Sequence, residues 1–231
     1  ILHFLEKTIY NNVDKLIFLA SEDEKKEFKR KLGYLPNNTE IIPLGINLSN
    51  YTGAKNNKSK KLVFLYLGRL IGVKGIDILL HSFKHINNNN FVLLIVGDGP
   101  DRMKLMKLSK KLGLGSKVKF WGHQKEIVPI LSISDVFVLP SFSEGLPTAL
   151  LEGMASKCAC LVTDIGLPVL HKETGYVVKP NDVNSLVSGI EYFFQNRDCV
   201  AYFSENAYDF VKSNHDIEKS AGLFFNLLRN L

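Results

Sequence analysis

The chain has 231 residues, 45% of them hydrophobic and 23% charged, which is typical of a globular protein of one or two domains with a substantial core. Its formal net charge of +6 suits anionic partners such as phosphates or an acidic membrane face, but is too small to indicate nucleic-acid binding. The longest apolar run, Phe91–Val96, is far shorter than the ~20 residues of a membrane-spanning helix. We therefore expect a soluble protein.

The start of the chain and its cysteines suggest what kind of protein it belongs to and in which cellular compartment it works. The chain opens at Ile1 without the pattern of a signal peptide, and we expect it to be a piece of a longer protein. Cys158, Cys160 and Cys199 form no paired framework, which favours a reducing cytoplasm. Cys158 and Cys160 alternate in a strand-like run and are best interpreted as small buried residues.

The first fifty residues contain one strand and one helix in succession. Residues 14–19 predict a short strand, and Ser21 with Glu24 three positions later forms a capping-box pattern that opens a helix. We expect this helix to end at Gly33. The polar, lysine- and asparagine-rich residues 51–61 indicate a linker or loop.

From Leu62 onward, short apolar runs alternate with helical segments. The runs are residues 62–67, 91–96, 118–121, 136–139, 158–163 and 176–178. Near-continuous apolar strands separated by helices predict an α/β fold, a Rossmann-like parallel sheet with helices on both faces. In such sheets ligands bind beyond the carboxyl ends of the strands. One of the helices, over residues 101–112, is expected to turn Met103, Leu105, Met106 and Leu108 toward the core.

The loop after the first of these runs carries two cations between glycines. Gly68 ends the strand, Arg69 follows it, and Lys74 with Gly75 opens the next helix. An arginine fork suits phosphate oxygens, and fixed cations stabilise a departing phosphate group. We therefore interpret this loop as a phosphate site.

The stretch from Pro140 to Glu152 places a polar turn between a buried strand and a helix expected to begin at Pro147. A fresh helix N-terminus favours an anion, and Glu144 and Glu152 lie where they can accept hydrogen bonds from sugar hydroxyls. Phosphate and sugar together describe a nucleotide-sugar site. Alone, the stretch also fits an ordinary capped helix with two surface glutamates.

These motifs together resemble retaining glycosyltransferases of family 4, which have the two-domain GT-B fold. The resemblance rests on the Gly68–Gly75 loop, the glutamates at 144 and 152, the Gly97–Pro100 turn and the stretch 175–182. It departs from the family pattern at Leu44, where asparagine is usual, and at Val169, where glutamate is usual.

The resemblance implies roles for individual residues. Arg69 and Lys74 would bind and stabilise the departing diphosphate, Glu144 would hold the donor sugar, and Glu152 would hold the ribose. With Glu144, Arg69 and Lys74 as catalytic residues, the other donor-binding positions would be Gly68, Gly97, Trp121, Gly145, Leu146, Pro147, Thr148 and Glu152. Trp121 could border the base, but a half-buried strand aromatic explains it equally well.

The resemblance also implies an organisation and a reaction. Residues 1–50 would be the end of an N-terminal acceptor domain with its linker, and residues 51–231 a nucleotide-sugar-binding domain. The enzyme would transfer a hexosyl residue from a nucleoside diphosphate sugar, UDP-sugar first among them, to a hydroxyl of a glycan or lipid-linked acceptor, with retention. We expect no metal or other cofactor, peripheral membrane contact at most, and donor binding by this chain with little or no transfer.

Two other classes of function stay open at this stage. One is another GT-B enzyme, such as a sugar phosphorylase or a nucleotide-sugar epimerase. The other is a non-catalytic module that binds a nucleotide sugar. Free sugar phosphate among the products would indicate a phosphorylase, whereas lack of transfer by the completed protein would indicate a binding module.

Overall fold

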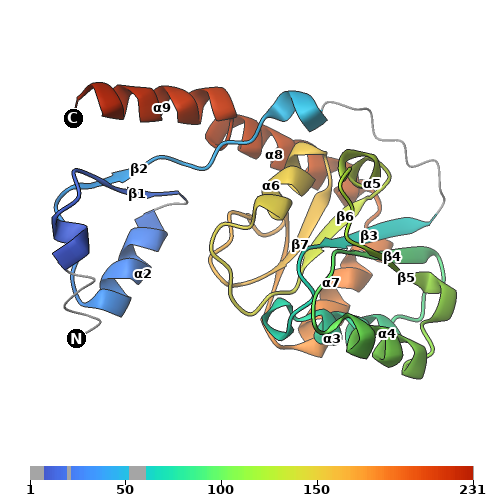
Figure 1. Cartoon of the computed structure of the whole chain (residues 1–231). Helices are drawn as coiled ribbons and strands as arrows, with labels where there is room; N and C mark the ends of the chain where they lie inside the picture. Colours follow the sequence, from blue (N-terminus) through green and yellow to red (C-terminus); the bar gives the residue numbers. More distant parts are fainter. Residues whose placement is uncertain (1–7, 20–21, 52–60, 231) are drawn as a thin grey trace. The chain divides into compact units, whose positions relative to one another are not determined.

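The computed structural model of the chain describes residues 8–19, 22–51 and 61–230. It divides into two compact units, one formed by residues 1–47 and 213–231 and the other by residues 48–212 (Figure 1). The sequence placed the domain boundary after residue 50 and kept residues 213–231 with the second domain. The predicted capping residue Ser21 lies outside the described residues.

The first unit is built on a short parallel sheet. β1 (Leu16–Phe18) pairs with β2 (Thr39–Ile41), and α2 (Glu22–Leu32) connects them. The helix ends at Gly33 as expected, with that glycine in the left-handed region at φ 73°. Its Phe28 ring packs edge-on against Phe18, which anchors the helix to the strand.

The final helix, α9 (Ile217–Arg229), is joined to this unit through the backbone. The Ile46 amide donates to the carbonyl of His215 at 2.8 Å, and the Ile217 amide donates to the carbonyl of Ile46 at 3.1 Å. Gly45 lies so close that a Cβ there would stand 2.6 Å from Ile217 Cα. This contact explains why residues 213–231 group with the first unit despite their distance in sequence.

The second unit alternates strands and helices as the apolar runs predicted. The strands are β3 (Leu62–Leu67), β4 (Phe91–Val96), β5 (Val118–Gly122), β6 (Val136–Leu139), β7 (Ala159–Thr163) and β8 (Gly175–Val178). The helices are α3 (Ile76–Lys84), α4 (Arg102–Lys111), α5 (Val128–Ser132), α6 (Thr148–Ala155), α7 (Val183–Gln195) and α8 (Asp198–Asn214), with short 3-10 turns η1 (Leu48–Tyr51), η2 (Gly72–Lys74) and η3 (Gly115–Lys117).

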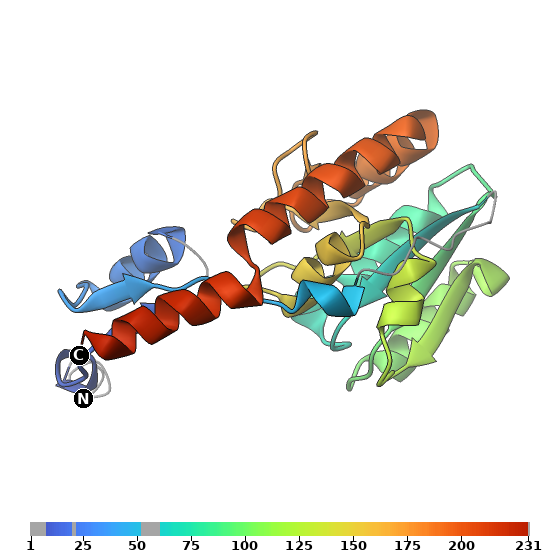
Figure 2. The ribbon, with the colours of Figure 1, turned by 90° about the horizontal axis from the view of Figure 1, so that it is seen from above.

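All six strands run parallel in the order β5-β4-β3-β6-β7-β8. The sheet therefore has two halves, β3-β4-β5 and β6-β7-β8, which meet at the neighbouring strands β3 and β6. Because parallel crossovers are right-handed, the crossover helices α3 and α4 of one half and α6 of the other fall on opposite faces. Figure 1 shows α3, α4 and α7 on one face and α6 on the other, and α6 lies in front of the strands in Figure 2. The predicted Rossmann-like parallel sheet with helices on both faces is confirmed.

The core is apolar and continuous on both sides of the central strands. Every residue of β6 and β7 is buried, as expected for strands covered on two faces. Cys158 and Cys160 are fully buried and confirmed as small core residues.

The prediction for α4 was partly wrong. Met103 and Met106 are 62% and 38% exposed, whereas Leu105 is buried. The helix buries only one narrow stripe, which Leu105 shares with Ser109 four positions later, and the two methionines lie off that stripe.

Candidate active site

In an open parallel sheet a ligand crevice is expected where the strand order reverses, and here that switch point lies between β3 and β6. β3 and β6 are neighbours, but the chain leaves their carboxyl ends toward opposite faces. The loops after them, residues 68–75 and 140–147, therefore meet at one place. These loops hold most of the residues that the sequence singled out.

Backbone contacts hold the two loops together. The Phe142 amide donates to the carbonyl of Val73 at 2.8 Å. Gly75 is in the left-handed region at φ 65°, and a Cβ there would stand 2.2 Å from the carbonyl oxygen of Pro140. Only glycine fits this position, because a side chain would push the loops apart and would strain the backbone.

An ion pair joins the two loops. Lys74 Nζ lies 2.7 Å from Oε1 and 2.6 Å from Oε2 of Glu144. The Ser141 hydroxyl donates to the same Oε1 at 2.6 Å, and the Thr163 hydroxyl donates to the carbonyl of Ser141 at 2.5 Å. The glutamate side chain is 7% exposed and the lysine side chain 20%. The carboxylate is thus held by a cation and a hydroxyl in a largely dry setting.

Tyr66 is fully buried at the end of β3. Its hydroxyl donates to the carbonyl of Arg69 at 2.8 Å, which shapes the start of the loop. Burial, together with the nearby charge of Glu144, raises the pKa of Tyr66 above its ordinary value. Arg69 itself is exposed.

The turn after β4 packs against the loop after β3. Gly97 has φ 128°, and a Cβ there would stand 1.9 Å from the carbonyl oxygen of Gly68. Its amide donates to the carbonyl of Gly122 at 2.8 Å. Gly68 and Gly97 therefore form the packed base of the site, and substitution of Gly97 would separate the loops.

Trp121 stands apart from the crevice, on the edge strand β5. Phe120 pairs with Ile95 and Gly122 with Val96, so Trp121 is the extra residue of a bulge. A bulge re-aims a side chain relative to the regular strand. Trp121 is 38% exposed, which leaves its indole face accessible at the same edge of the sheet.

The turn Gly145-Leu146-Pro147-Thr148 leads from Glu144 into α6. The helix begins at Thr148 and Pro147 is its N-cap residue, with an extended backbone at ψ 110°. The prediction that Pro147 is the first helical residue was therefore wrong by one position. No described side chain caps this terminus, and the Leu150 amide donates to the carbonyl of Pro147 at 3.0 Å.

Glu152 lies further along α6 and has a different partner from Glu144. The Tyr51 hydroxyl, from η1, donates to Glu152 Oε1 at 3.0 Å. Burial raises the pKa of Glu152, and the bond from Tyr51 acts in the opposite direction. Tyr51 was missed by sequence analysis, because nothing in the local pattern links it to a residue 101 positions away.

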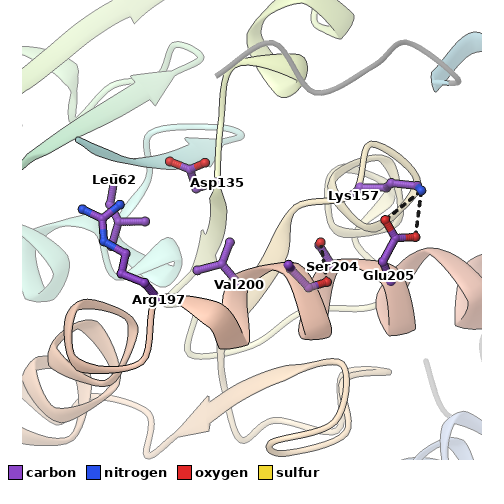
Figure 3. Close-up of a pocket in the computed structure, with 8 residues that line it drawn as sticks. Leu62, Asp135, Lys157, Arg197, Val200, Ser204 and Glu205 are labelled. Atoms are coloured by element: carbon purple, nitrogen blue, oxygen red, sulfur yellow. Dashed lines mark hydrogen bonds and ion pairs between the residues drawn. The ribbon is translucent and has the colours of Figure 1, made fainter. Parts of the chain in front are cut away.

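A separate cavity opens at the other end of the sheet. It has a volume of about 460 Å³ and is lined by Leu62, Asp135, Lys157, Arg197, Val200, Ala201, Ser204 and Glu205 (Figure 3). Leu62 begins β3 and Asp135 precedes β6, so this cavity lies at the amino edge, away from the loops described above. Its Lys157 is paired with Glu205 at 2.7 Å.

The described part of the chain holds neither a metal-binding cluster nor a membrane-spanning helix. No group of three or more histidine, cysteine, aspartate or glutamate side chains is arranged there to hold a metal ion. Among the described helices, none combines the length and the apolar character needed to cross a bilayer.

The sequence model of the family described as "Glycosyl transferases group 1" matches residues 50–210, and the chain belongs to this family. It is similar to UDP-Gal:alpha-D-GlcNAc-diphosphoundecaprenol alpha-1,3-galactosyltransferase of Escherichia coli, with 32% identity over 196 residues, 76% of this chain and 50% of that protein. The chain spans about half the length of the curated relatives it matches.

Solved structures share the fold. Anabaena Alr3699/HepE in complex with UDP gives a TM-score of 0.90 at 19% identity, over 99% of this chain and 67% of that chain. The C-terminal domain of a glycosyl transferase group 1 family protein, LpcC, from Francisella tularensis gives 0.68 at 22% identity, over 75% of this chain and 100% of that chain. The architecture is therefore that of GT-B glycosyltransferases.

Proposed function

We propose that this chain is the donor-binding part of a retaining glycosyltransferase of family 4 that uses a UDP-sugar. The observation that carries the proposal is the meeting of Lys74 and Glu144 across the β3 and β6 loops, beside the N-terminus of α6. Similar proteins support it, since one is a UDP-Gal galactosyltransferase and another was solved in complex with UDP.

In this proposal the diphosphate lies between the two loops. Lys74, the exposed Arg69 and the N–H groups at the start of α6 would face its oxygens. As the bond between the anomeric carbon and the diphosphate oxygen breaks, negative charge grows on the leaving diphosphate. Fixed cations and backbone dipoles stabilise that charge without reorganising, which lowers the barrier.

The glutamates would take the hydroxyls of the donor. Glu144, held by Ser141 and Lys74, would accept hydrogen bonds from the sugar, and Glu152 would accept them from the ribose. Gly68 and Gly97 would let the backbone approach the nucleotide closely. The backbone would also come close to the nucleotide at the turn Gly145-Leu146-Pro147-Thr148. Trp121 would border the base.

The same proposal assigns a separate role to each domain of the whole protein. Residues 1–50 would end an acceptor domain whose larger part lies outside this chain, and residues 51–231 would bind the donor. The acceptor would be a glycan or a lipid-linked glycan, met at the cytoplasmic face of a membrane. No metal would be needed, because Arg69, Lys74 and the α6 terminus supply the positive charge.

A transfer assay tests this proposal. Labelled UDP-hexoses are offered with lipid-linked and free sugar acceptors, first to this chain alone and then to the chain completed by its N-terminal half. We expect little or no transfer by the chain alone and transfer by the completed protein, with the anomeric configuration of the donor kept, as read from the anomeric proton by nuclear magnetic resonance.

Three results would contradict the proposal. An inverted product would exclude the retaining reaction. Free sugar phosphate as the product would indicate a phosphorylase instead. Turnover by the chain alone would show that the acceptor half is not required.

A further inference from the structure

Tyr51 connects the segment before the sheet to the carboxylate proposed to bind ribose. It is the last residue of η1, which packs against α6, and it is half-buried. Its hydroxyl lies 3.0 Å from Glu152 Oε1. Glu152 is also only partly exposed, so water competes weakly for this bond.

The protonation of the pair fixes the direction of the hydrogen bond. Burial, followed by the charge of Glu152, raises the pKa of Tyr51 to about 12, so the phenol keeps its proton and donates. On the other side, the bond lowers the pKa of Glu152 and so opposes the effect of burial. The phenol therefore helps to keep the carboxylate ionised, which is the form that accepts hydrogen bonds with both oxygens.

The bond also fixes the orientation of the carboxylate. A glutamate side chain has three rotatable bonds, and the last one is only weakly restricted by itself. With Oε1 held by Tyr51, rotation of the carboxylate is restricted and Oε2 is left as the oxygen for another donor. No described residue donates a hydrogen bond to Oε2.

We propose that Tyr51 is a positioning residue for nucleotide recognition: its hydroxyl fixes the Glu152 carboxylate so that Oε2 accepts from the ribose hydroxyls of the donor. The inference rests on the proposed function, because it takes Glu152 as the ribose ligand. The inference attributes part of the preference for ribose over deoxyribose to a residue of η1, which is far in sequence from the motif that carries Glu152.

The test compares the binding of UDP, 2′-deoxy-UDP and 3′-deoxy-UDP by calorimetry. Four forms of the full chain are used: unaltered, Tyr51→Phe, Glu152→Gln and Tyr202→Phe. Tyr51→Phe keeps the ring and its packing and removes only the hydroxyl. Tyr202→Phe is the matched control, because Tyr202 is 56% exposed on α8, away from the site.

We expect the unaltered chain and Tyr202→Phe to prefer UDP over at least one deoxy analogue. In Tyr51→Phe the affinity for UDP should fall about threefold to tenfold, within the range of one typical hydrogen bond, while the affinity for the deoxy analogue falls less. The ratio of the two dissociation constants should shrink. A purely structural role would weaken all three ligands equally and leave the ratio unchanged.

The other outcomes distinguish a failure of the Tyr51 inference from a failure of the proposed ribose site at Glu152. If Glu152→Gln abolishes the preference for UDP but Tyr51→Phe keeps it, Tyr51 has no positioning role and the ribose site stands. If Tyr51→Phe binds all three ligands more tightly, the phenol only occupies the place of a ribose hydroxyl, which overturns the inference. If Glu152→Gln has no effect, or the unaltered chain shows no preference, the ribose assignment itself fails.

Discussion

Glu144 neutralises the lysine that a diphosphate would need. Its carboxylate is 2.6 Å from Lys74 Nζ, and both side chains are mostly shielded from water. A bound diphosphate would have to share or replace this partner, and it would also lie near the negative charge of Glu144. The pair thus holds the cation in place at the cost of some affinity for the anion.

This arrangement predicts an increase in affinity from a site mutation. Glu144→Gln should bind UDP about threefold to tenfold more tightly, roughly 0.6–1.4 kcal/mol, because Lys74 is released and a repulsive charge is removed. Transfer by the completed enzyme should fall at least about a hundredfold, because the sugar loses a charged acceptor. Calorimetry with UDP and the transfer assay measure the two effects.

The matched control is Glu191→Gln, which removes the same charge on α7, away from the crevice. It should leave both quantities unchanged. Weaker UDP binding by Glu144→Gln would contradict this account, since it would mean that Glu144 is needed mainly to hold Lys74 ready for phosphate.

At the scale of elements, His215 joins the end of α8 to the start of α9. It is 4% exposed, and its Nδ1 lies 2.9 Å from the carbonyl oxygen of Leu44. Because that oxygen can only accept, Nδ1 carries the proton of this hydrogen bond. Burial lowers the pKa of His215 below its ordinary value of 6.5, against a smaller opposite effect of the bond to Leu44.

A lowered pKa gives a defined pH dependence. Between the pKa of the folded state and 6.5, the unfolded chain binds more protons, so folding stability falls as the pH falls through this window. The folding stability that this histidine contributes is fully present above about pH 6.5. Below that pH it is lost at no more than about 1.4 kcal/mol per pH unit. We expect amide protection of α9 to weaken from pH 7 to pH 5.5, as measured by hydrogen exchange corrected for the intrinsic rate.

His215→Asn is the informative variant for this prediction. Asparagine can place an N–H near the position of Nδ1 but does not titrate. The variant should keep α9 protected at pH 5.5 relative to pH 7. Equal weakening in both proteins would show that another group causes the change.

The elements themselves were largely predictable from the sequence, for a physical reason. Strands of a parallel sheet are buried on both faces, so β3, β4 and β6 appear as unbroken apolar runs whose ends match those observed. It was harder to predict which side chains of a helix are buried, because burial depends on the angular position of each residue around the helix axis. Met103 and Met106 on α4 are the example.

The site was predictable only as far as local motifs reach. The Gly68–Gly75 loop and the Glu144 turn can each be found from neighbouring residues, and the strand order explains why they meet. The Lys74–Glu144 pair spans 70 positions and the Tyr51–Glu152 bond spans 101. Such contacts depend on the three-dimensional packing of the β3 and β6 loops and of η1 on α6, which leave no periodic signal.

At the scale of the whole molecule, the second unit contains every residue proposed to bind the donor. Residues 48–212 include both glutamates, both cations and Tyr51. The loops at the carboxyl ends of β3 and β6 bring Lys74 and Glu144 together, and Tyr51 of η1 contacts Glu152 of α6. We therefore expect this chain to bind the nucleotide without the rest of the protein, and without a metal ion.

The most direct test is calorimetric titration of this chain with UDP, GDP and ADP, with and without magnesium, repeated for Lys74→Ala, Glu152→Ala and the exposed-lysine control Lys84→Ala. We predict selective binding of UDP that does not need magnesium, is weakened at least about tenfold in Lys74→Ala and Glu152→Ala, and is unchanged in Lys84→Ala. Binding that persists in both site variants, or absence of binding to all three nucleotides, would contradict the placement of the nucleotide at the β3 and β6 loops.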